Sequence, residues 1–485
     1  MDATDLCFTS AVELAKLIRR RALSPVEIVR AVLERIDRLN TRLGAYVMVH
    51  AERALGEARE VERAVMAGEP LGPLHGVPIS IKDNLWTVGE RTTYGSRLLA
   101  EFVAPEDAPS VAGLRAAGAI FVGRTNLPEF AWRGSTDNRL FGESRNPWDL
   151  TRTPGGSTGG GAAAVAAGLA PLALGSDGAG SIRIPASFCG LVGLKPTFGR
   201  VPMYPAAGGN ELVAHVCPLA RTVRDVALMM NTIARHDRRD PFALPDDGVD
   251  YLAACDKPLA NARGGGARVR IAWSADLGFA AVERETREIA EAAARSFAEI
   301  GLPVEEARPD LGDPSVILET LYGGAQAGAH AGRSAEQKAQ MDPELVAYAE
   351  ASAGLSAAEY LRAVAARQAL VDALRRFFER YDLLLTPTVC LPAFPLGVVG
   401  PSELAGRKVT HLGWTLCYPF NYSGQPAVSV PAGWTASGLP VGLQIVGRRL
   451  EDALVLRAAA AFEALRPWAS RRPSVDRSVA PPGSR

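Results

Sequence analysis

Residues 77–177 alternate segments typical of buried strands with segments typical of helices, which restricts the chain to few folds. In GVPISIKDN, Val77, Ile79 and Ile81 alternate with other residues, and this strand pattern places Lys82 near its end. The segment PSVAGLRAAGAIFVGRTN predicts a helix and then a strand, and GGGAAAVAAGLAPLALGSD repeats that order. Alternating units of this kind predict an α/β fold with a mostly parallel, buried sheet and helices on its faces.

The segments outside this region extend the same architecture. Residues 8–40 predict two helices, and Ser24 and Glu27 are placed to form a capping box around Pro25. The strand patterns YDLLLTPTV, QPAVSVPAGW and LPVGLQIVG precede a final helix, DALVLRAAAAFEAL. We divide the chain into N-terminal helices packed on the core, a core segment, an elaboration on the substrate side, a C-terminal part of the core sheet and a disordered tail: residues 1–70, 71–240, 241–380, 381–469 and 470–485.

Charge and cysteine content exclude several kinds of partner. The chain has 53 basic and 53 acidic residues, so it lacks the long-range basic field that attracts nucleic acid or an anionic membrane. Its six cysteines contain no C-x-x-C pair, which predicts neither a zinc site nor a disulfide framework and favours the reducing cytoplasm. The N-terminus has no secretory-signal pattern. The longest uncharged run, 153–176, is mostly Gly and Ala and predicts a buried helix and strand, not a membrane span.

Two serines, each set among glycines, are the candidate chemical groups. Ser157 lies in TPGGSTGGG, and Ser181 follows 24 positions later in SDGAGSIRIP. A serine hydroxyl is a weak nucleophile until a base removes its proton, and none of the six histidines lies in a motif of its own. GGSTG matches the G-x-S-x-G nucleophile elbow of α/β-hydrolases. That turn follows directly on an apolar strand, whereas Ser157 follows DLTRTPGG, which argues against this alternative.

Lys82 is the other candidate base. Burial in apolar surroundings lowers the pKa of a lysine amine by several units, which leaves free amine available near neutral pH. The glycines around Ser181 allow successive backbone N–H groups to point at one oxygen, as an oxyanion hole requires. Gly-Ser runs are also common in loops, and a single lysine on a strand is usually a surface residue. From these residues alone, both interpretations stay open.

Three segments resemble the amidase signature family, whose members use a Ser-Ser-Lys triad. They are GVPISIKDN, PGGSTGGGAAAVAAG and GSDGAGSIRIPASFCGLVGLKPTFGRVP. The similarity extends from about residue 10 to residue 470 and includes TNLPEFAW. The resemblance implies an α/β/α fold in which helices flank both faces of a large mixed central sheet. It also implies an amidase that hydrolyses the C–N bond of linear amides without a metal or organic cofactor.

The resemblance also implies roles for individual residues. Ser181 would be the nucleophile that forms an acyl-enzyme, later hydrolysed by water. Ser157, which follows a cis peptide bond at Gly156, would relay protons between Ser181 and the base Lys82. The oxyanion hole would consist of four backbone N–H groups, those of Gly178, Ala179, Gly180 and Ser181.

The sequence departs from the commonest family pattern at two positions. Thr158 stands where a second serine is frequent, a change that keeps the hydroxyl group. Ala179 stands where glycine is common, and we expect the oxyanion hole to survive if its φ is negative. Asp177 and Arg183 flank the loop with opposite charges, and we expect an ion pair that holds the loop in preference to a contact with substrate.

The substrate pocket is the least constrained part of the prediction, because family resemblance does not fix specificity. Candidate wall residues lie after the signature, in the 320–345 region and before PFNYSGQP; those named individually are Met203, Tyr204, Trp414 and Cys417. These side chains favour a small uncharged aryl or alkyl amide, and the same machinery suits a carbamate (urethane) or ester. We expect a monomer or homodimer that has no nucleic-acid or membrane partner.

Two alternatives belong to other functional classes. The first is the glutamine-hydrolysing subunit of a tRNA-dependent amidotransferase, which resembles the chain through the signature. Against it stand the residues DGAG at 177–180, where that branch typically carries D-T-G-G, and the absence of a recognisable glutamine-carboxylate site. The second is a catalytically inactive binding protein, which the presence of all three triad residues argues against.

Overall fold

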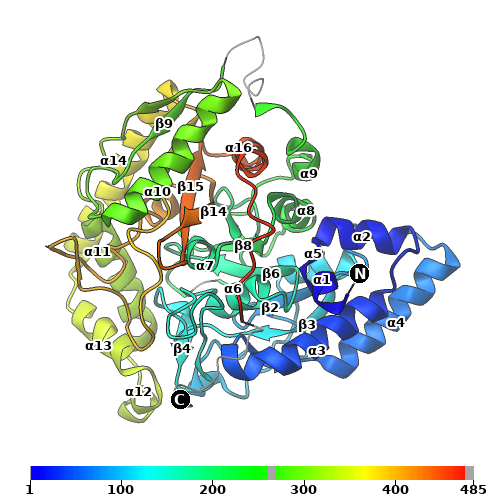
Figure 1. Ribbon diagram of the computed structural model, residues 1–485. Coiled ribbons are helices and arrows are strands. Elements are labelled where there is room, and N and C mark those ends of the chain that lie inside the picture. The colour runs from blue at the N-terminus through cyan, green and yellow to red at the C-terminus, as the bar shows by residue number, and fades with distance from the viewer. Residues whose placement is uncertain (1, 207, 260–267, 476–485) are drawn as a thin grey trace, which may run out of the picture.

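One mixed sheet runs through the part of the chain that the computed structural model describes, residues 2–206, 208–259 and 268–475. Within these residues it has eleven strands in the order β1-β3-β2-β6-β8-β7-β14-β15-β11-β9-β10, with helices around it (Figure 1). The strands are β1 (Tyr46–Val49), β2 (Pro78–Lys82), β3 (Ile120–Thr125), β6 (Leu172–Asp177), β7 (Val192–Lys195), β8 (His215–Ala220), β9 (Ile271–Trp273), β10 (Val304–Glu306), β11 (Leu383–Pro387), β14 (Ala427–Trp434) and β15 (Pro440–Gly447). Two small hairpins lie outside the sheet: β4–β5 (Asp137–Asn138, Gly142–Glu143) and β12–β13 (Glu403–Leu404, Arg407–Lys408).

Strand direction follows the kind of connection between strands. The alternating segment gives parallel pairs of β2 with β3 and β6, and β11, β9 and β10 are parallel at the other end of the sheet. The central pairs are antiparallel, so the expectation of a mostly parallel sheet is wrong there, whereas the mixed sheet is confirmed. Within the described residues no helix separates β7 from β8 or β14 from β15, and strands joined without a crossover helix pair antiparallel.

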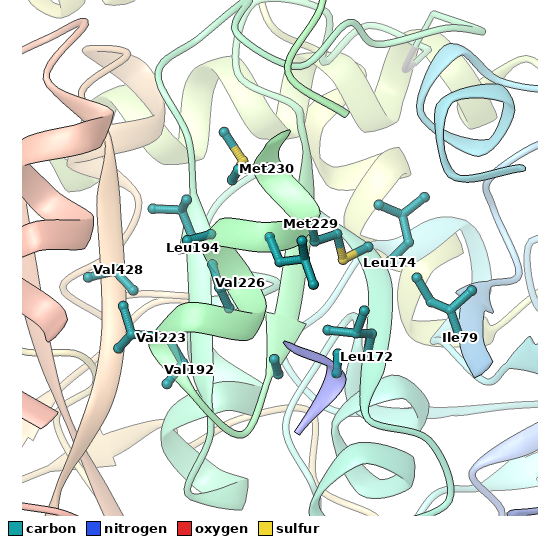
Figure 2. Packing of buried hydrophobic residues seen from close by; sticks show 14 of the residues in the cluster. Ile79, Leu172, Leu174, Val192, Leu194, Val223, Val226, Met229, Met230 and Val428 are labelled. Atoms are coloured by element: carbon teal, nitrogen blue, oxygen red, sulfur yellow. The ribbon is translucent and has the colours of Figure 1, made fainter. Parts of the chain in front are cut away.

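A hydrophobic layer lies between one face of the sheet and α8 (Val223–Ile233), and Figure 2 shows its side chains. The strands contribute fully buried aliphatic residues at alternate positions, namely Ile79, Leu172, Leu174, Val192, Leu194 and Val428. Because side chains alternate along a strand, the residues between them face the opposite side. Ser80 pairs with Ala173 and Ile81 with Leu174, so the next residue, Lys82, lies beside Gly175 on the opposite face.

That opposite face carries α6 (Gly159–Ala166) and α7 (Arg183–Cys189). Every residue of α6, GGGAAAVA, is buried. Its small side chains pack with Ala173, Cys217 and Leu219 of the sheet. Small residues allow the helix to lie close to the strands, which brings the segment before α6 against the end of β2.

The other helices surround this centre (Figure 1). The capping box predicted around Pro25 is present, with Ser24 and Glu27 bonded to each other's backbone N–H groups. The N-terminal helices are α1 (Ala3–Phe8), α2 (Ala11–Arg19), α3 (Pro25–Leu43), α4 (Ala51–Ala67) and α5 (Pro109–Ala116). The later helices are α9 (Tyr251–Ala254), α10 (Arg284–Arg295), α11 (Ser315–Gln326), α12 (Ala335–Gln340), α13 (Pro343–Ser352), α14 (Ala357–Arg380), α15 (Pro419–Tyr422) and α16 (Asp452–Leu465).

The predicted division of the chain stays a prediction, but two of its segments have further roles in the structure. Within 241–380, β9 and β10 extend the central sheet. In the tail, residues 470–475 are described, and the expectation of disorder does not fit them. Val475 is buried, and its carbonyl oxygen accepts a hydrogen bond from Arg42. The rest of the tail, 476–485, lies outside the described residues.

Candidate active site

Lys82 lies at the end of β2 with its side chain fully buried. Its Nζ is within hydrogen-bond distance of three hydroxyl oxygens: Ser157 Oγ at 2.8 Å, Thr158 Oγ1 at 3.1 Å and Ser176 Oγ at 2.9 Å. The Thr158 N–H donates to the carbonyl oxygen of Ser181 at 3.1 Å, and Ser157 and Ser181 line the same cavity. The structure therefore brings the lysine and both predicted serines together.

Local backbone geometry makes this approach possible. The peptide bond between Gly156 and Ser157 is cis, as the resemblance implied. A Cβ atom on Gly175 would lie 2.4 Å from Thr158 Cγ2, so only glycine allows Ser157 and Thr158 to approach Lys82 this closely. The residues that lead into Ser157 form a loop. The nucleophile-elbow alternative would require a strand there.

The surroundings of Lys82 favour its neutral amine. Burial lowers the pKa of Lys82 to about 7, although the nearby Asp177 carboxylate acts in the opposite direction. Thr158 donates its hydroxyl proton to the carbonyl oxygen of Ser176, and Asn84 Nδ2 donates to Ser176 Oγ. The Thr158 oxygen therefore accepts an N–H from Lys82, and Ser176 Oγ is set to accept the second N–H. The amine lone pair is left for the hydroxyl proton of Ser157.

The Asp177 carboxylate organises the loop that carries Ser181. Both of its oxygens lie 2.9 Å from Arg183 nitrogens, and both side chains are fully buried. Asn421 Nδ2 donates to the same carboxylate at 2.8 Å. Burial alone would raise the pKa of Asp177, but Arg183 and Asn421 outweigh it and hold that pKa well below its ordinary value. The ion pair predicted from the sequence is thus present, and Asn421 is a partner that the sequence analysis missed.

The predicted oxyanion hole needs one correction. The Gly180 N–H donates to Asp177 Oδ1 at 2.7 Å, so it is already used. The N–H groups of Gly178, Ala179 and Ser181 have no hydrogen-bond partner in the described part of the chain. Ala179 keeps a negative φ, which meets the condition set for this departure. Gly180 instead has a φ of 128°, and a Cβ there would lie 2.8 Å from Cys417 Cβ.

Replacing Arg183 by methionine is expected to lower the free energy of unfolding by about 3 to 5 kcal/mol, because it leaves the buried Asp177 charge without its partner. Urea unfolding followed by circular dichroism measures the loss. The exposed Arg362 on α14 provides the control, and its methionine variant should change stability by less than about 0.5 kcal/mol. Equal stability of the two variants would contradict a holding role for the ion pair.

A cavity of about 300 Å³ opens at the two serines. Its walls include Met203 and Tyr204, as predicted, and residues of the predicted 320–345 region. Several aromatic and polar wall residues were not predicted individually from the sequence: Tyr94, Phe130, Trp132, Tyr322, Gln326 and His330. The segment TNLPEFAW, which contains Phe130 and Trp132, was part of the resemblance and is the one signal that pointed to this wall.

Trp414 and Cys417 are not wall residues, and their assignment to the pocket is wrong. Trp414 is fully buried and stacks on Phe188 at a ring distance of 6.0 Å. Cys417 is also fully buried, behind Gly180, and its carbonyl oxygen accepts a hydrogen bond from Arg183. Cys417 thus supports the loop that carries Ser181 from the core side, whereas Trp414 packs on α7, which follows that loop.

Known proteins are similar to almost the whole of this chain. A sequence model of the family described as Amidase matches residues 27–456. An acylamidase of Rhodococcus erythropolis is 41% identical over 98% of this chain and 99% of its own length. A glutamyl-tRNA(Gln) amidotransferase subunit from Moorella thermoacetica is 39% identical over 97% of this chain and 99% of its own length. The solved structure of a bacterial aryl acylamidase of the amidase signature family superposes with a TM-score of 0.88 at 33% identity, covering 96% of this chain and 97% of that one.

Proposed function

The chain belongs to the amidase signature family and hydrolyses the carbon–nitrogen bond of amides, and from this premise we propose that Ser181, Ser157 and Lys82 perform the reaction. The observation that carries the proposal is the 2.8 Å hydrogen bond between Lys82 Nζ and Ser157 Oγ beside the cavity that contains Ser181. Serine hydrolysis needs a base, and a buried amine with a pKa of about 7 provides one at neutral pH.

In the proposed reaction Ser181 Oγ attacks the substrate carbonyl carbon. The Ser181 proton passes to Ser157 Oγ, while the Ser157 proton passes to Lys82 Nζ. The N–H groups of Gly178, Ala179 and Ser181 stabilise the negative oxygen of the tetrahedral intermediate. Collapse of the tetrahedral intermediate breaks the C–N bond. Lys82 returns a proton through Ser157 to the leaving nitrogen. Water then attacks the acyl-enzyme and gives a proton to Lys82 through Ser157. The same path returns a proton to Ser181 Oγ as the carboxylic acid leaves.

The cavity supports a small uncharged amide with an aryl or alkyl group as substrate. Its walls include the aromatic side chains of Tyr94, Phe130 and Trp132. Such walls bind flat or aliphatic groups by burying apolar surface. Similarity to an acylamidase and to an aryl acylamidase also supports this class. Carbamates and esters share the acyl geometry and belong to the same test.

The test uses one acyl group joined to three leaving groups. Release of p-nitroaniline or p-nitrophenol is measured for the anilide, the carbamate and the ester with the wild type and with Ser181→Ala. Turnover of the anilide or carbamate by the wild type alone supports the proposal and ranks the substrates. Equal turnover by both proteins would mean that Ser181 is not the nucleophile.

The amidotransferase alternative is favoured by one observation, the 39% identity to the glutamyl-tRNA(Gln) amidotransferase subunit of Moorella thermoacetica. Glutaminase activity on free glutamine, with ammonia as the measured product, separates the two functions. Ammonia release that requires added partner subunits, together with failure to cleave any anilide, would replace our proposal with this one.

Replacing His215 by alanine is expected to lower kcat/KM less than about tenfold, because His215 does not line the cavity that contains Ser181, whereas loss of a general base costs about 10²- to 10⁴-fold. His215 is buried away from the cavity, with Nδ1 2.8 Å from the carbonyl oxygen of Val213 and Nε2 3.2 Å from Lys195 Nζ. Burial, followed by the nearby Lys195, lowers its pKa well below the ordinary value. Anilide hydrolysis by the purified variant checks this, and complete loss in a folded variant would reinstate a histidine base.

We also propose that the protein acts in the cytoplasm as a monomer or homodimer without nucleic acid. Cys189, Cys217, Cys255, Cys390 and Cys417 are free thiols, which supports a reducing compartment. Among the helices that the structure describes, none combines the length and apolarity needed to cross a membrane. Gel filtration with light scattering determines the oligomeric state.

A further inference from the structure

Two polar side chains from α11 and the turn after it line the cavity, and each has a polar group without a hydrogen-bond partner among the described residues. Gln326 ends α11, and His330 lies four residues later in a π-helical turn, Ala327–Ala331. They are only 4% and 6% exposed, and both line the cavity that contains Ser181. Turns of this kind occur frequently at functional sites. Neither residue has a role in the bond-breaking steps described above.

The hydrogen bonding of His330 fixes which of its nitrogens is the donor. Arg333 Nε donates to His330 Nδ1 at 3.4 Å, so the proton of the neutral ring is on Nε2. Burial, followed by the charge of Arg333, lowers the pKa of His330 to about 4, which keeps the ring neutral at pH 7. Phe130 packs against the imidazole at a ring distance of 4.8 Å. In the described part of the chain, nothing accepts the Nε2 proton.

Gln326 is the second unsatisfied group. Its carboxamide makes no hydrogen bond within the described residues, although the side chain is almost completely buried. Its polar atoms are not sealed off from the cavity, so a group that enters the cavity can reach them. Leaving a carboxamide without any partner is costly. The two unpaired groups on one wall of the substrate cavity are therefore satisfied by what enters that cavity.

We propose that Gln326 and His330 bind a second carbonyl group of the substrate, so that the enzyme prefers amides bearing another carbonyl over hydrocarbon amides of the same shape. A carbonyl oxygen has two lone pairs, which match the donors Gln326 Nε2–H and His330 Nε2–H. A site built for a polar group rejects an isostere that lacks it, because its own buried groups then stay unpaired. This inference rests on the proposed function and narrows its substrate class.

The test compares isosteric p-nitroanilides. In one series the acyl chain ends in a primary carboxamide, as in 4-carbamoylbutanoyl, and in the other it ends in an isopropyl group, as in 5-methylhexanoyl. Both series span two to five methylenes, so that the same experiment also finds the best chain length. At the best length, the wild type should show a kcat/KM about 10- to 100-fold higher for the carboxamide. A ratio near one at every length would overturn the proposal.

Variants connect that preference to the two residues. The quantity compared is the ratio of kcat/KM for the carboxamide to kcat/KM for the isopropyl compound. In Gln326→Leu, and separately in His330→Phe, this ratio should fall at least about fivefold, mainly through a higher KM for the carboxamide. The control Gln368→Leu changes an exposed residue of α14 and should keep the wild-type ratio. An unchanged ratio in both cavity variants would refute the assignment.

A binding measurement separates this proposal from the proposed function. Calorimetric titration of Ser181→Ala with the two parent compounds, 4-carbamoylbutanoyl and 5-methylhexanoyl p-nitroanilide, requires no turnover. Suppose that Ser181→Ala binds the carboxamide more tightly than the isopropyl compound, and that this preference disappears in Ser181→Ala/Gln326→Leu. That result supports the binding site even if the wild type cleaves neither compound. Equal affinity for the two compounds, with normal cleavage by the wild type, would refute the binding site and leave the proposed function standing.

Discussion

Ser181→Ala is expected to lower kcat for an acyl p-nitroanilide by about 10⁴- to 10⁶-fold, because it removes the atom that forms the acyl-enzyme. The backbone N–H groups of Gly178 and Ala179 remain, so substrate binding should change much less than kcat. Steady-state release of p-nitroaniline measures the effect. Circular dichroism confirms that the variant is folded.

The control for this variant is Ser437→Ala, which removes an exposed hydroxyl in the turn between β14 and β15 and should retain full activity. Mass spectrometry with a slowly deacylated ester provides an independent readout. The wild type should gain the mass of one acyl group on the peptide that contains Ser181. Acylation of Ser157 or Ser176 instead, with Ser181 unmodified, would disprove the assignment of the nucleophile.

Lys82→Met is expected to lower kcat/KM by about 10²- to 10⁴-fold at pH 8, the usual contribution of a general base. The wild type should lose activity as the pH falls below about 7, where the buried Lys82 amine takes up a proton in the folded enzyme. Each further pH unit should then cost about tenfold in kcat/KM. The pH profile of anilide hydrolysis shows this limb directly.

A second buried lysine makes the profile of the variant informative. Burial, followed by the charge of Arg183, lowers the pKa of Lys195 to about 7 as well. The fall in kcat/KM below about pH 7, called the acidic limb, should be absent from the residual activity of Lys82→Met. The same limb should persist in Lys195→Met. Lys408→Met changes an exposed lysine and should leave both the rate and the profile unchanged. A limb that survives in Lys82→Met would make Lys195, not Lys82, the titrating base.

Local sequence patterns predicted those features of the fold and the site that depend only on short segments. The alternation in GVPISIKDN located β2 and its terminal lysine, and the glycine-rich contexts of Ser157 and Ser181 marked the other two members of the site. These signals lie within a few neighbours of each residue. They therefore survive in the sequence even though the three residues meet only in the fold.

Contacts between distant segments were not predictable in this way. No local pattern reveals that the Gly180 N–H points to Asp177, since that depends on how the loop folds back on a buried carboxylate. Trp414 was assigned to the pocket because aromatic residues suit both pockets and cores, and only the packing on Phe188 distinguishes the two. The antiparallel centre of the sheet likewise depends on connections that lack helices.

The position of β14 and β15 affects when the enzyme becomes active during synthesis. These strands come from the last part of the chain, yet they lie between β7 and β11 in the sheet. Asn421, just before β14, holds the Asp177 carboxylate. A nascent chain that has already emerged with all three triad residues therefore still has an incomplete sheet and an unsupported catalytic loop. Hydrolytic activity is therefore expected to begin only after the C-terminal strands have left the ribosome, and premature termination products are expected to be inactive.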